Sequence, residues 1–222
     1  MKNFWQTEKR LMTGDWHAHT SYTDGRSSVN DYCREAVSRG LKLLTFTEHV
    51  RREMSYNYSD FVADIIQGRQ EFDIELLVGC EAKVLDTVGS LDVSEDVLKQ
   101  CDAVTAVFHS FLKVDKQSYL KALKAMLGNP KVDIWGHPLL FARRNNINLE
   151  KAEKEFIINL CVENRVLIER NLKYQLPEID FIRLAAEKSA RFVIGSDAHS
   201  AEELPTSEKL EQEWRYIAGD EK

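Results

Sequence analysis

The histidines of this chain are the residues whose placement most clearly indicates chemistry. All six lie in short motifs, and each motif falls where a predicted strand ends. The motifs are Asp15-Trp16-His17-Ala18-His19-Thr20, Thr47-Glu48-His49, Phe108-His109-Ser110, Gly136-His137-Pro138 and Gly195-Ser196-Asp197-Ala198-His199. Histidine is the commonest side-chain ligand of protein-bound metals. Because no histidine is left for a surface helix or a tail, the sequence predicts a metal centre.

Two of these motifs place a pair of possible ligands two residues apart. His17 and His19 alternate along an extended segment, so both rings lie on one side of the strand and can bind one ion. Asp197 and His199 have the same spacing with a mixed ligand set. A single pair of this kind is weak evidence, and a lone histidine after a strand is more often structural. The prediction therefore rests on all six histidines together.

Two further carboxylates extend the candidate ligand set. Asp24 lies in Thr23-Asp24-Gly25 on the first loop, and Glu81 directly follows a predicted strand in Gly79-Cys80-Glu81. Taken alone, Asp24 is typical of a turn before glycine, and Glu81 is typical of the polar end of a buried strand. Six imidazoles and three carboxylates are too many for one ion and fit two or three divalent cations, with Glu81 as a bridge. Nitrogen and oxygen ligands without thiolate suit zinc, manganese or iron.

Several divalent ions a few ångströms apart suit the hydrolysis of phosphate esters. Such ions lower the pKa of a bridging water and bind both oxygens of a displaced ester. Phosphatases often add arginine, whose guanidinium binds phosphate through two parallel hydrogen bonds. Arg143 and Arg170 both lie just beyond predicted strand ends, so we expect them to bind phosphate. Lys173 and Tyr174 are expected at the rim of the same site.

The elements that must position these residues alternate between strand and helix. Apolar runs predict strands at about 11–16, 41–46, 74–80, 103–108, 132–135, 165–169 and 191–194. Amphipathic stretches predict helices at about 28–39, 59–71, 117–127, 149–163, 177–190 and 207–218. This alternation is typical of a parallel α/β barrel, whose active sites lie where the strands end. The fold would therefore bring the motifs together from distant parts of the sequence.

Length and composition set limits on the class of protein. The 222 residues suit one domain, 1–222, and 43% hydrophobic with 30% charged residues is ordinary for a globular protein. The net charge of -6 does not favour binding to long nucleic acids. Neither a signal peptide nor a run long enough to cross a bilayer is visible. Four scattered cysteines indicate a reducing cytoplasm. The sequence leaves the oligomeric state open.

The motifs taken in order resemble the PHP (polymerase and histidinol phosphatase) superfamily over nearly the whole chain. The resemblance implies a distorted seven-stranded (βα)7 barrel, TIM-like, with a trinuclear metal site at the C-terminal ends of the strands. It implies that the first ion is held by His17, His19, Glu81 and Asp197, the second by Glu81, His109 and His137, and the third by Asp24, His49 and His199. Some relatives have histidine at the position of Asp24, which would shift metal preference.

The resulting hypothesis is a metal-dependent phosphomonoesterase in which a metal-bridged hydroxide attacks phosphorus. Glu81, Asp197 and His199 are the candidate catalytic residues as well as ligands. The resemblance favours a histidinol-phosphatase-like enzyme that acts on a small-molecule phosphate ester, because the loops between the motifs are short. An acidic residue would be expected to meet a substrate amine, and the candidates are Glu48, Glu53 and Glu169.

Two other functions remain open on the sequence alone. The same ions would serve an exonuclease or nucleotide phosphodiesterase, since the resemblance includes polymerase-associated exonucleases. The segment that comes nearest to a basic track with interleaved aromatic residues is Arg51-Arg52-Glu53-Met54-Ser55-Tyr56-Asn57-Tyr58. A metal-stabilised interaction domain without catalysis is the third hypothesis, and the intact ligand set argues against it.

Overall fold

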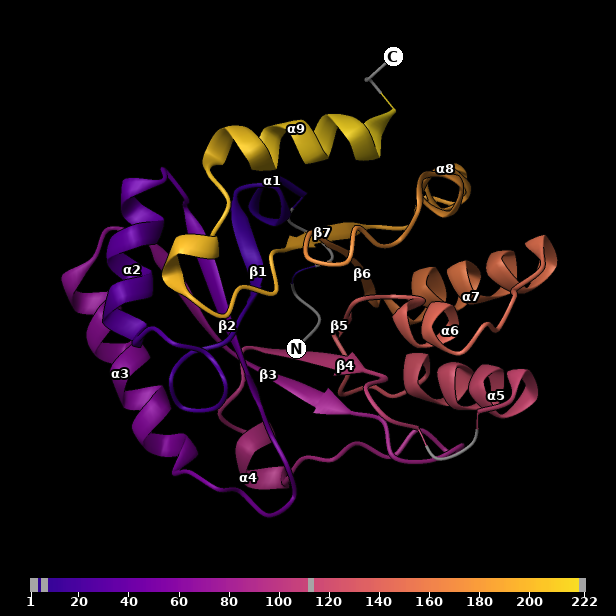
Figure 1. Ribbon diagram of the computed structural model, residues 1–222, viewed down its shortest axis with the longest axis horizontal. Coiled ribbons are helices and arrows are strands. Elements are labelled where there is room, and N and C mark those ends of the chain that lie inside the picture. The colour runs from indigo at the N-terminus through magenta and orange to yellow at the C-terminus, as the bar shows by residue number, and fades with distance from the viewer. Residues whose placement is uncertain (1–3, 5–7, 112–113, 220–222) are drawn as a thin grey trace.

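The strands of the chain form one parallel sheet that curls into a nearly closed barrel. The computed structural model describes residues 4, 8–111 and 114–219. In this part of the chain seven strands pair in sequence order, each parallel to the next (Figure 1). They are β1 (Gly14–Ala18), β2 (Leu43–His49), β3 (Glu75–Lys83), β4 (Ala103–Val107), β5 (Ile134–Trp135), β6 (Leu167–Asn171) and β7 (Phe192–Gly195). The predicted (βα)7 barrel is confirmed.

The barrel closes between its first and last strands through a few backbone contacts. Ala18 and Ala198 form an isolated parallel bridge just beyond the end of β7. The amide of Asp197 donates to the carbonyl of His17 at 2.9 Å, and the amide of His19 donates to the carbonyl of Ala198 at the same distance. The closure therefore brings together the two motifs that each carry a pair of candidate ligands.

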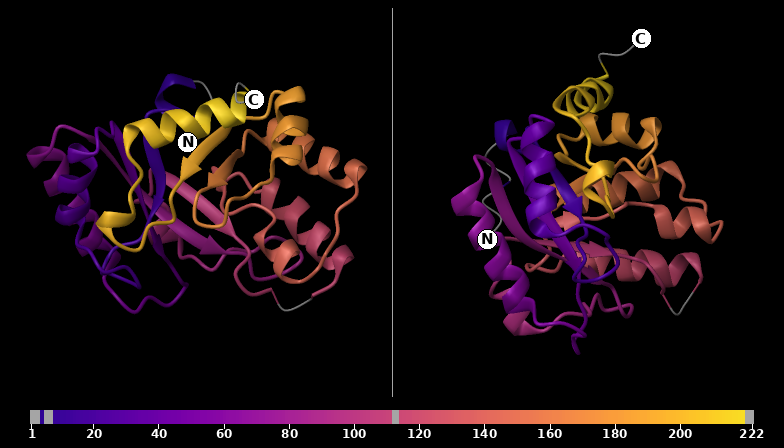
Figure 2. Two further views of the ribbon diagram at one scale, coloured as in Figure 1. Left: turned by 45° about the horizontal axis from the view of Figure 1, so that its top comes forward. Right: turned by 60° about the vertical axis from the view of Figure 1, so that its left-hand side comes forward.

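Helices cover the outside of the barrel. The helices that follow the strands are α2 (Val29–Ser38), α3 (Tyr58–Glu71), α4 (Glu95–Leu98), α5 (Lys116–Leu127), α6 (Leu140–Arg144), α7 (Lys151–Asn164), α8 (Ile179–Glu187) and α9 (Ser207–Ala218), with α1 (Glu8–Leu11) before β1 and a 3-10 turn at Ala201–Glu203. The views agree that α2 and α3 lie on one side of the barrel and α5 and α7 on the other (Figures 1 and 2). Short α4 and α6 were not predicted, because one turn of helix leaves little periodicity in a sequence.

The interior of the barrel is apolar at one end and polar at the other. Each strand contributes one buried apolar side chain to a separate cluster, namely Trp16, Leu43, Leu77, Ala103, Ile134, Leu167 and Val193. Side chains of a strand alternate between its two faces with a period of two. Further along the strands, the side chains on the same face as this apolar cluster are polar. Glu81, Glu169 and Asn171 are examples, and all three are buried. The apolar layer supports a polar layer at the carboxyl ends of the strands.

Several strands extend further toward their carboxyl ends than the apolar pattern predicts. β2 continues to His49, β3 includes Glu81 and β6 continues to Asn171. The backbone pairing persists through these polar residues because they too are buried or half-buried inside the barrel. No helix in the described ranges has both the length and the apolar character needed to cross a membrane. The four cysteines are free and buried.

Candidate metal centre

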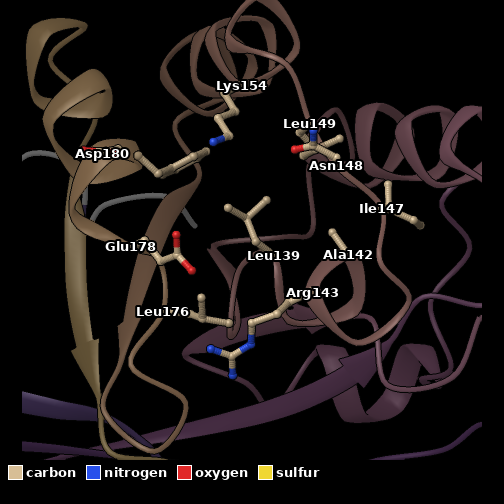
Figure 3. A pocket seen from close by; sticks show the side chains of 11 residues that line it. Leu139, Ala142, Arg143, Ile147, Asn148, Leu149, Lys154, Leu176, Glu178 and Asp180 are labelled. Atoms are coloured by element: carbon tan, nitrogen blue, oxygen red, sulfur yellow. The ribbon is translucent and has the colours of Figure 1, made fainter.

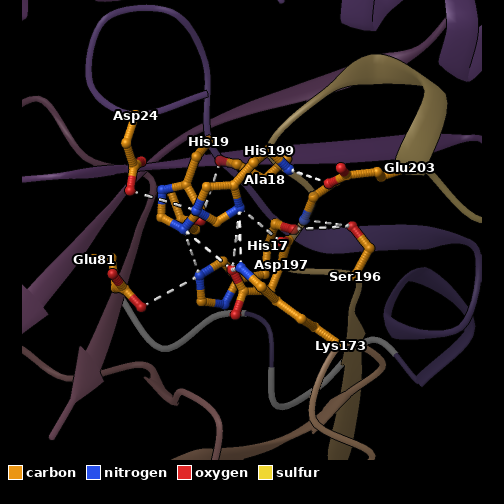
Figure 4. Close-up of polar contacts among 12 residues, drawn as sticks. His17, Ala18, His19, Asp24, Glu81, Lys173, Ser196, Asp197, His199 and Glu203 are labelled. Atoms are coloured by element: carbon orange, nitrogen blue, oxygen red, sulfur yellow. Dashed lines mark hydrogen bonds and ion pairs between the residues drawn. The ribbon is translucent and has the colours of Figure 1, made fainter. Parts of the chain in front are cut away.

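The nine predicted metal ligands lie together at the carboxyl ends of the strands. Each of them has a ligand atom within 3.5 Å of a ligand atom of another member of the set. The set is His17, His19, Asp24, His49, Glu81, His109, His137, Asp197 and His199, six of which are labelled in Figure 4. As predicted from the sequence, the barrel brings residues that are up to 182 positions apart into one cluster.

Glu81 lies at the centre of the cluster. Its Oε1 is 3.0 Å from His137 Nε2, 3.3 Å from His109 Nε2 and 3.4 Å from His17 Nε2. Its other oxygen, Oε2, is 2.6 Å from His49 Nδ1. One carboxylate therefore faces four imidazole rings that come from β1, β2 and the ends of β4 and β5. This geometry suits a carboxylate that bridges two ions.

The β1 pair and Asp197 form one corner of the cluster. His17 Nε2 and His19 Nε2 are 3.0 Å apart, and His19 Nε2 is 3.7 Å from Asp197 Oδ1. Asp197 has a left-handed backbone, with φ at 56°. Such conformations cost energy in residues other than glycine and occur preferentially at functional sites. Here the conformation turns the carboxylate back toward the β1 histidines.

Asp24 and His199 form the more exposed corner. Asp24 Oδ2 is 3.3 Å from His49 Nε2 and 3.5 Å from His199 Nε2. The rings of His19 and His49 stack with their centroids 4.3 Å apart, which joins this corner to the buried one. Buried Glu48 holds the loop that carries Asp24, since its carboxylate accepts hydrogen bonds from the Thr20 amide and the Thr23 hydroxyl.

The donor atoms of the cluster fit divalent cations better than they fit one another. His19 Nδ1, His49 Nδ1 and Glu81 Oε2 are buried without a well-aligned hydrogen-bond partner among the described residues. His109 Nε2 and His137 Nε2 face each other at 3.2 Å. Buried polar atoms in proteins are normally paired, so atoms that converge without pairing indicate a missing partner. Three groups of three ligand atoms each converge within 4.8 Å: His17/His19/Asp197, His19/His49/His199 and His49/Glu81/His109.

Burial and the close approach of these side chains shift the pKa values of several members of the cluster. Burial would raise the pKa of Glu81, but its close contacts with four histidines hold that pKa well below its usual range. Burial lowers the pKa of His19, and the neighbouring imidazoles of His17, His49 and His199 lower it further against the attraction of Glu81. Burial also opposes a charge on His17, yet Glu169 and Glu81 raise its pKa well above the ordinary value. The protein therefore supplies an ionised carboxylate at the centre.

Polar residues of β6 and the loop after it surround the cluster. The amide of Asn171 donates to Asp197 Oδ2 at 3.4 Å. Lys173 Nζ is 3.2 Å from Asp197 Oδ1 and 3.2 Å from His199 Nδ1, so the ammonium lies directly beside two candidate ligands (Figure 4). The ring of Tyr174 contacts His137 edge-on. The sequence predicts Lys173 and Tyr174 at the rim, and their contacts place them there.

Arg170 does not lie in this cluster, contrary to the sequence-based expectation. Its guanidinium pairs with Glu213 of α9 at 3.1 Å, donates to the Pro177 carbonyl and the Gln175 side chain, and lies over the Tyr216 ring. The reason is alternation, because β6 continues through Arg170. Its neighbours Glu169 and Asn171 contact the cluster, so Arg170 points to the opposite face of the sheet. It is buried and its donors are occupied.

Arg143 is exposed and lies on α6, close to the loop after β6. Its Nη1 donates to the Tyr174 carbonyl at 3.1 Å. It also lines a cavity of about 210 Å³ together with Leu139, Leu176, Lys154 and Glu178 (Figure 3). Arg143 therefore remains available to a ligand near the rim, but no direct contact joins it to the histidine cluster.

The sequence is similar to a known protein family and to known proteins. Residues 15–173 match the PHP domain family. The chain is 31% identical over 205 residues to a probable phosphatase of Caldanaerobacter subterraneus, a match that covers 83% of this chain and 75% of that protein. It is 27% identical over 202 residues to the DNA polymerase/3'-5' exonuclease PolX of Bacillus subtilis. That match covers 86% of this chain but 35% of PolX, so the chain spans about a third of that protein's length.

The fold is also similar to a solved structure. The histidinol phosphate phosphatase of Lactococcus lactis, crystallised with zinc, L-histidinol and phosphate, has a TM-score of 0.72 to this chain at 19% sequence identity. The match covers 94% of this chain and 93% of that chain. At this identity the likeness is one of fold.

Proposed function

The chain belongs to the PHP family, and on that premise we propose that it is a metal-dependent phosphoesterase that hydrolyses a small phosphate monoester. The observation that carries the proposal is the shared carboxylate of Glu81, which faces four imidazoles at the centre of a nine-residue donor cluster. The probable phosphatase among the relatives and the zinc-containing Lactococcus enzyme support the same chemistry. We further propose that residues 1–222 act as a single catalytic domain.

The donor groups fit two or three divalent ions. We propose that His17, His19, Glu81 and Asp197 hold one ion, Glu81, His109 and His137 a second, and Asp24, His49 and His199 a third. Zinc, manganese and iron all accept imidazole and carboxylate ligands, and zinc accompanies the Lactococcus enzyme. When bound, the ions supply positive charge that polarises a phosphate ester and acidifies water.

The protein's own residues complete the site for a phosphate group. Lys173 adds a positive charge beside Asp197 and His199, so phosphate that approaches this corner meets an ammonium donor. Asp197 faces both the Lys173 ammonium and the Asn171 amide, which fix the orientation of its carboxylate. We propose that Glu81, Asp197 and His199 act catalytically as well as by binding metal, and that Arg143 contributes a second phosphate contact at the rim.

A leaving group that carries an amine would need an acidic partner near the site. Of the acidic residues expected to meet a substrate amine, Glu48 is buried and occupied by Thr20 and Thr23. Glu169 is buried and occupied by His17 and Asn171. Glu53 is exposed on the loop after β2, so it alone of the three has a carboxylate in solvent. An amine-bearing alcohol, such as the product of a histidinol-phosphatase-like reaction, would have to reach that loop.

A nuclease is the second candidate, and the similarity to PolX is the observation that favours it. The segment that comes nearest to a basic track is partly neutralised, because Arg51 Nε lies 3.7 Å from Asp92 Oδ2. The net charge of -6 also disfavours a long polyanion. We therefore rank hydrolysis of a small monoester above hydrolysis of nucleic acid.

Phosphate release from a panel of esters tests the proposal. The purified protein would be loaded with zinc or with manganese and given histidinol phosphate, sugar phosphates, nucleoside monophosphates and a short oligonucleotide. We expect turnover of a small monoester that disappears in the His17→Ala variant. Release of nucleotides from the oligonucleotide, with no turnover of any monoester, would favour the nuclease over the proposed monoesterase. No turnover by a metal-loaded protein on any member of the panel would refute the phosphoesterase.

A further inference from the structure

Glu169 of β6 is a buried carboxylate inside the barrel, directly below the histidine cluster. It is 1% exposed. Its Oε1 lies 2.7 Å from His17 Nδ1 and 3.3 Å from the Asn171 amide nitrogen, and its Oε2 accepts a hydrogen bond from the backbone amide of His137. One side chain thus contacts a candidate ligand on β1 and the backbone of another candidate ligand after β5. Glu169 is not among the nine candidate metal ligands.

Two glycines of the sequence motifs border this carboxylate, and one of them, Gly195, makes room for it. A Cβ atom on Gly195 would overlap Glu169 Oε1 and would lie 2.7 Å from the Cβ of His17. A Cβ atom on Gly136 would lie 3.6 Å from Glu169 Oε2 and 2.6 Å from two side-chain carbons of β4. Glycine at position 195 is therefore required by close packing around the β6 carboxylate, whereas glycine at position 136 is required by close packing against β4, and neither residue has a positive φ.

We propose that Glu169 is a positioning residue that prepares His17 for metal binding, an inference that rests on the proposed metal-dependent function. A carboxylate can only accept hydrogen bonds, so Glu169 Oε1 fixes the proton of His17 on Nδ1. When Nε2 loses its own proton on metal binding, its lone pair is directed toward His19 and Glu81, where an ion would lie. Carboxylates that fix the tautomer and orientation of a metal-binding histidine in this way are common in metal sites.

The second oxygen gives Glu169 a further role at the neighbouring strand. By accepting from the His137 amide, it holds the turn after β5, where His137 has φ of 24°. A glutamine at position 169 has one acceptor oxygen and one donor nitrogen. If its oxygen keeps the His137 amide, its nitrogen must face His17 Nδ1. That nitrogen donates, so it would move the ring proton to Nε2 and block metal binding there.

Metal binding by Glu169→Gln tests the proposal without reliance on turnover. Glu213→Gln is the matched control, because Glu213 is also a buried carboxylate but pairs with Arg170 and Lys209, away from the cluster. Each protein would be stripped of metal and titrated with zinc in competition with a chromophoric chelator. We expect Glu169→Gln to weaken one zinc site by about 10- to 100-fold and Glu213→Gln to leave zinc affinity unchanged. Cobalt substitution should alter the visible absorption bands in the first variant and preserve them in the second.

Zinc affinity and cobalt bands that match the wild type in Glu169→Gln would overturn the proposal, whatever happens to thermal stability. A histidine ¹⁵N measurement on the zinc-loaded wild type covers the case in which the variant does not fold. It should find His17 protonated on Nδ1 and metal-bound through Nε2, and the reverse would also overturn it. If the wild type binds zinc but hydrolyses no ester, the proposed phosphoesterase activity is refuted. The metal-binding results would still decide the role of Glu169.

Discussion

Replacement of Asp15 by asparagine should have an effect on the stability of the metal-free protein that depends on pH. The free energy of unfolding of the variant, relative to that of the wild type, should be higher above neutral pH than in acid. Asp15 opens the first histidine motif and is fully buried. Its Oδ1 accepts from the amides of His17 and Ser196 at 3.1 and 2.8 Å, which joins β1 to the segment after β7. Its Oδ2 has no hydrogen-bond partner among the described residues. Asparagine keeps the accepting oxygen and removes the buried charge.

The magnitude follows from the pKa of Asp15. Burial raises that pKa from 3.8 to about 6, against the opposing effect of hydrogen bonds from Ser196 and His17. Because the folded-state pKa is the higher one, the protonated carboxyl favours the fold, and stability is lost as pH rises from about 4 through about 6. Full ionisation costs about 3 kcal/mol, of which about 1.4 kcal/mol falls between pH 5 and pH 8. The amide nitrogen of asparagine remains unpaired, and this constant cost of about 1–3 kcal/mol does not change with pH.

Denaturant unfolding of the wild type and Asp15→Asn at pH 5 and pH 8, both in chelator, measures the effect. The free energy of unfolding of the variant relative to the wild type should rise by about 1.4 kcal/mol between the two pH values. Asp31→Asn is the control. A hydrogen bond from Ser28 holds the pKa of Asp31 below its usual value, so Asp31 stays ionised over this range and its difference from the wild type should stay constant. An equally constant difference for Asp15→Asn would refute a buried, titrating carboxyl at the motif's first residue.

Three further predictions concern the arginines and the ions. In steady-state assays, Arg143→Met should raise KM for the phosphate ester by about tenfold, as expected for loss of one charged hydrogen bond. Arg144→Met is the control, because Arg144 lies on the same short helix but stacks on the Tyr174 ring. This second variant should leave KM within about twofold. Glu213→Ala should lower the free energy of unfolding by about 3 kcal/mol, because it leaves the Arg170 guanidinium buried without its carboxylate partner. Turnover per folded molecule should not change. A large drop in turnover would contradict the placement of Arg170 outside the active site. Chelation should lower the melting temperature in a scan of the wild type, since each ion present at 100 times its Kd stabilises the fold by about 2.7 kcal/mol, and the His17→Ala protein should show a smaller drop.

The clustering of the nine candidate ligands was predictable from the sequence because most of them are of one residue type. Histidine is rare enough in this chain that all six positions could be interpreted together, and the strand-helix alternation supplied the geometry that joins them. The strand ends were less predictable. Apolar periodicity stops at residues such as Trp16 and Phe46, while the backbone pairing of β1 and β2 continues through His17 and His49. A polar residue buried at a metal site looks the same in sequence as a polar residue at the start of a loop.

The same limit explains why the contacts of Arg170 and Glu169 differ from those expected of them. If β6 ended at Glu169, Arg170 would lie on the loop and could reach phosphate. The register of β6 with β7 continues through Asn171, where it pairs with Gly195. An extension of two residues therefore fixes alternate side chains inside and outside the barrel. Glu169 and Asn171 face the histidines, Arg170 faces α9, and Lys173 on the following turn carries the positive charge to the cluster. Which cation reaches the histidine cluster is thus decided by where one strand ends.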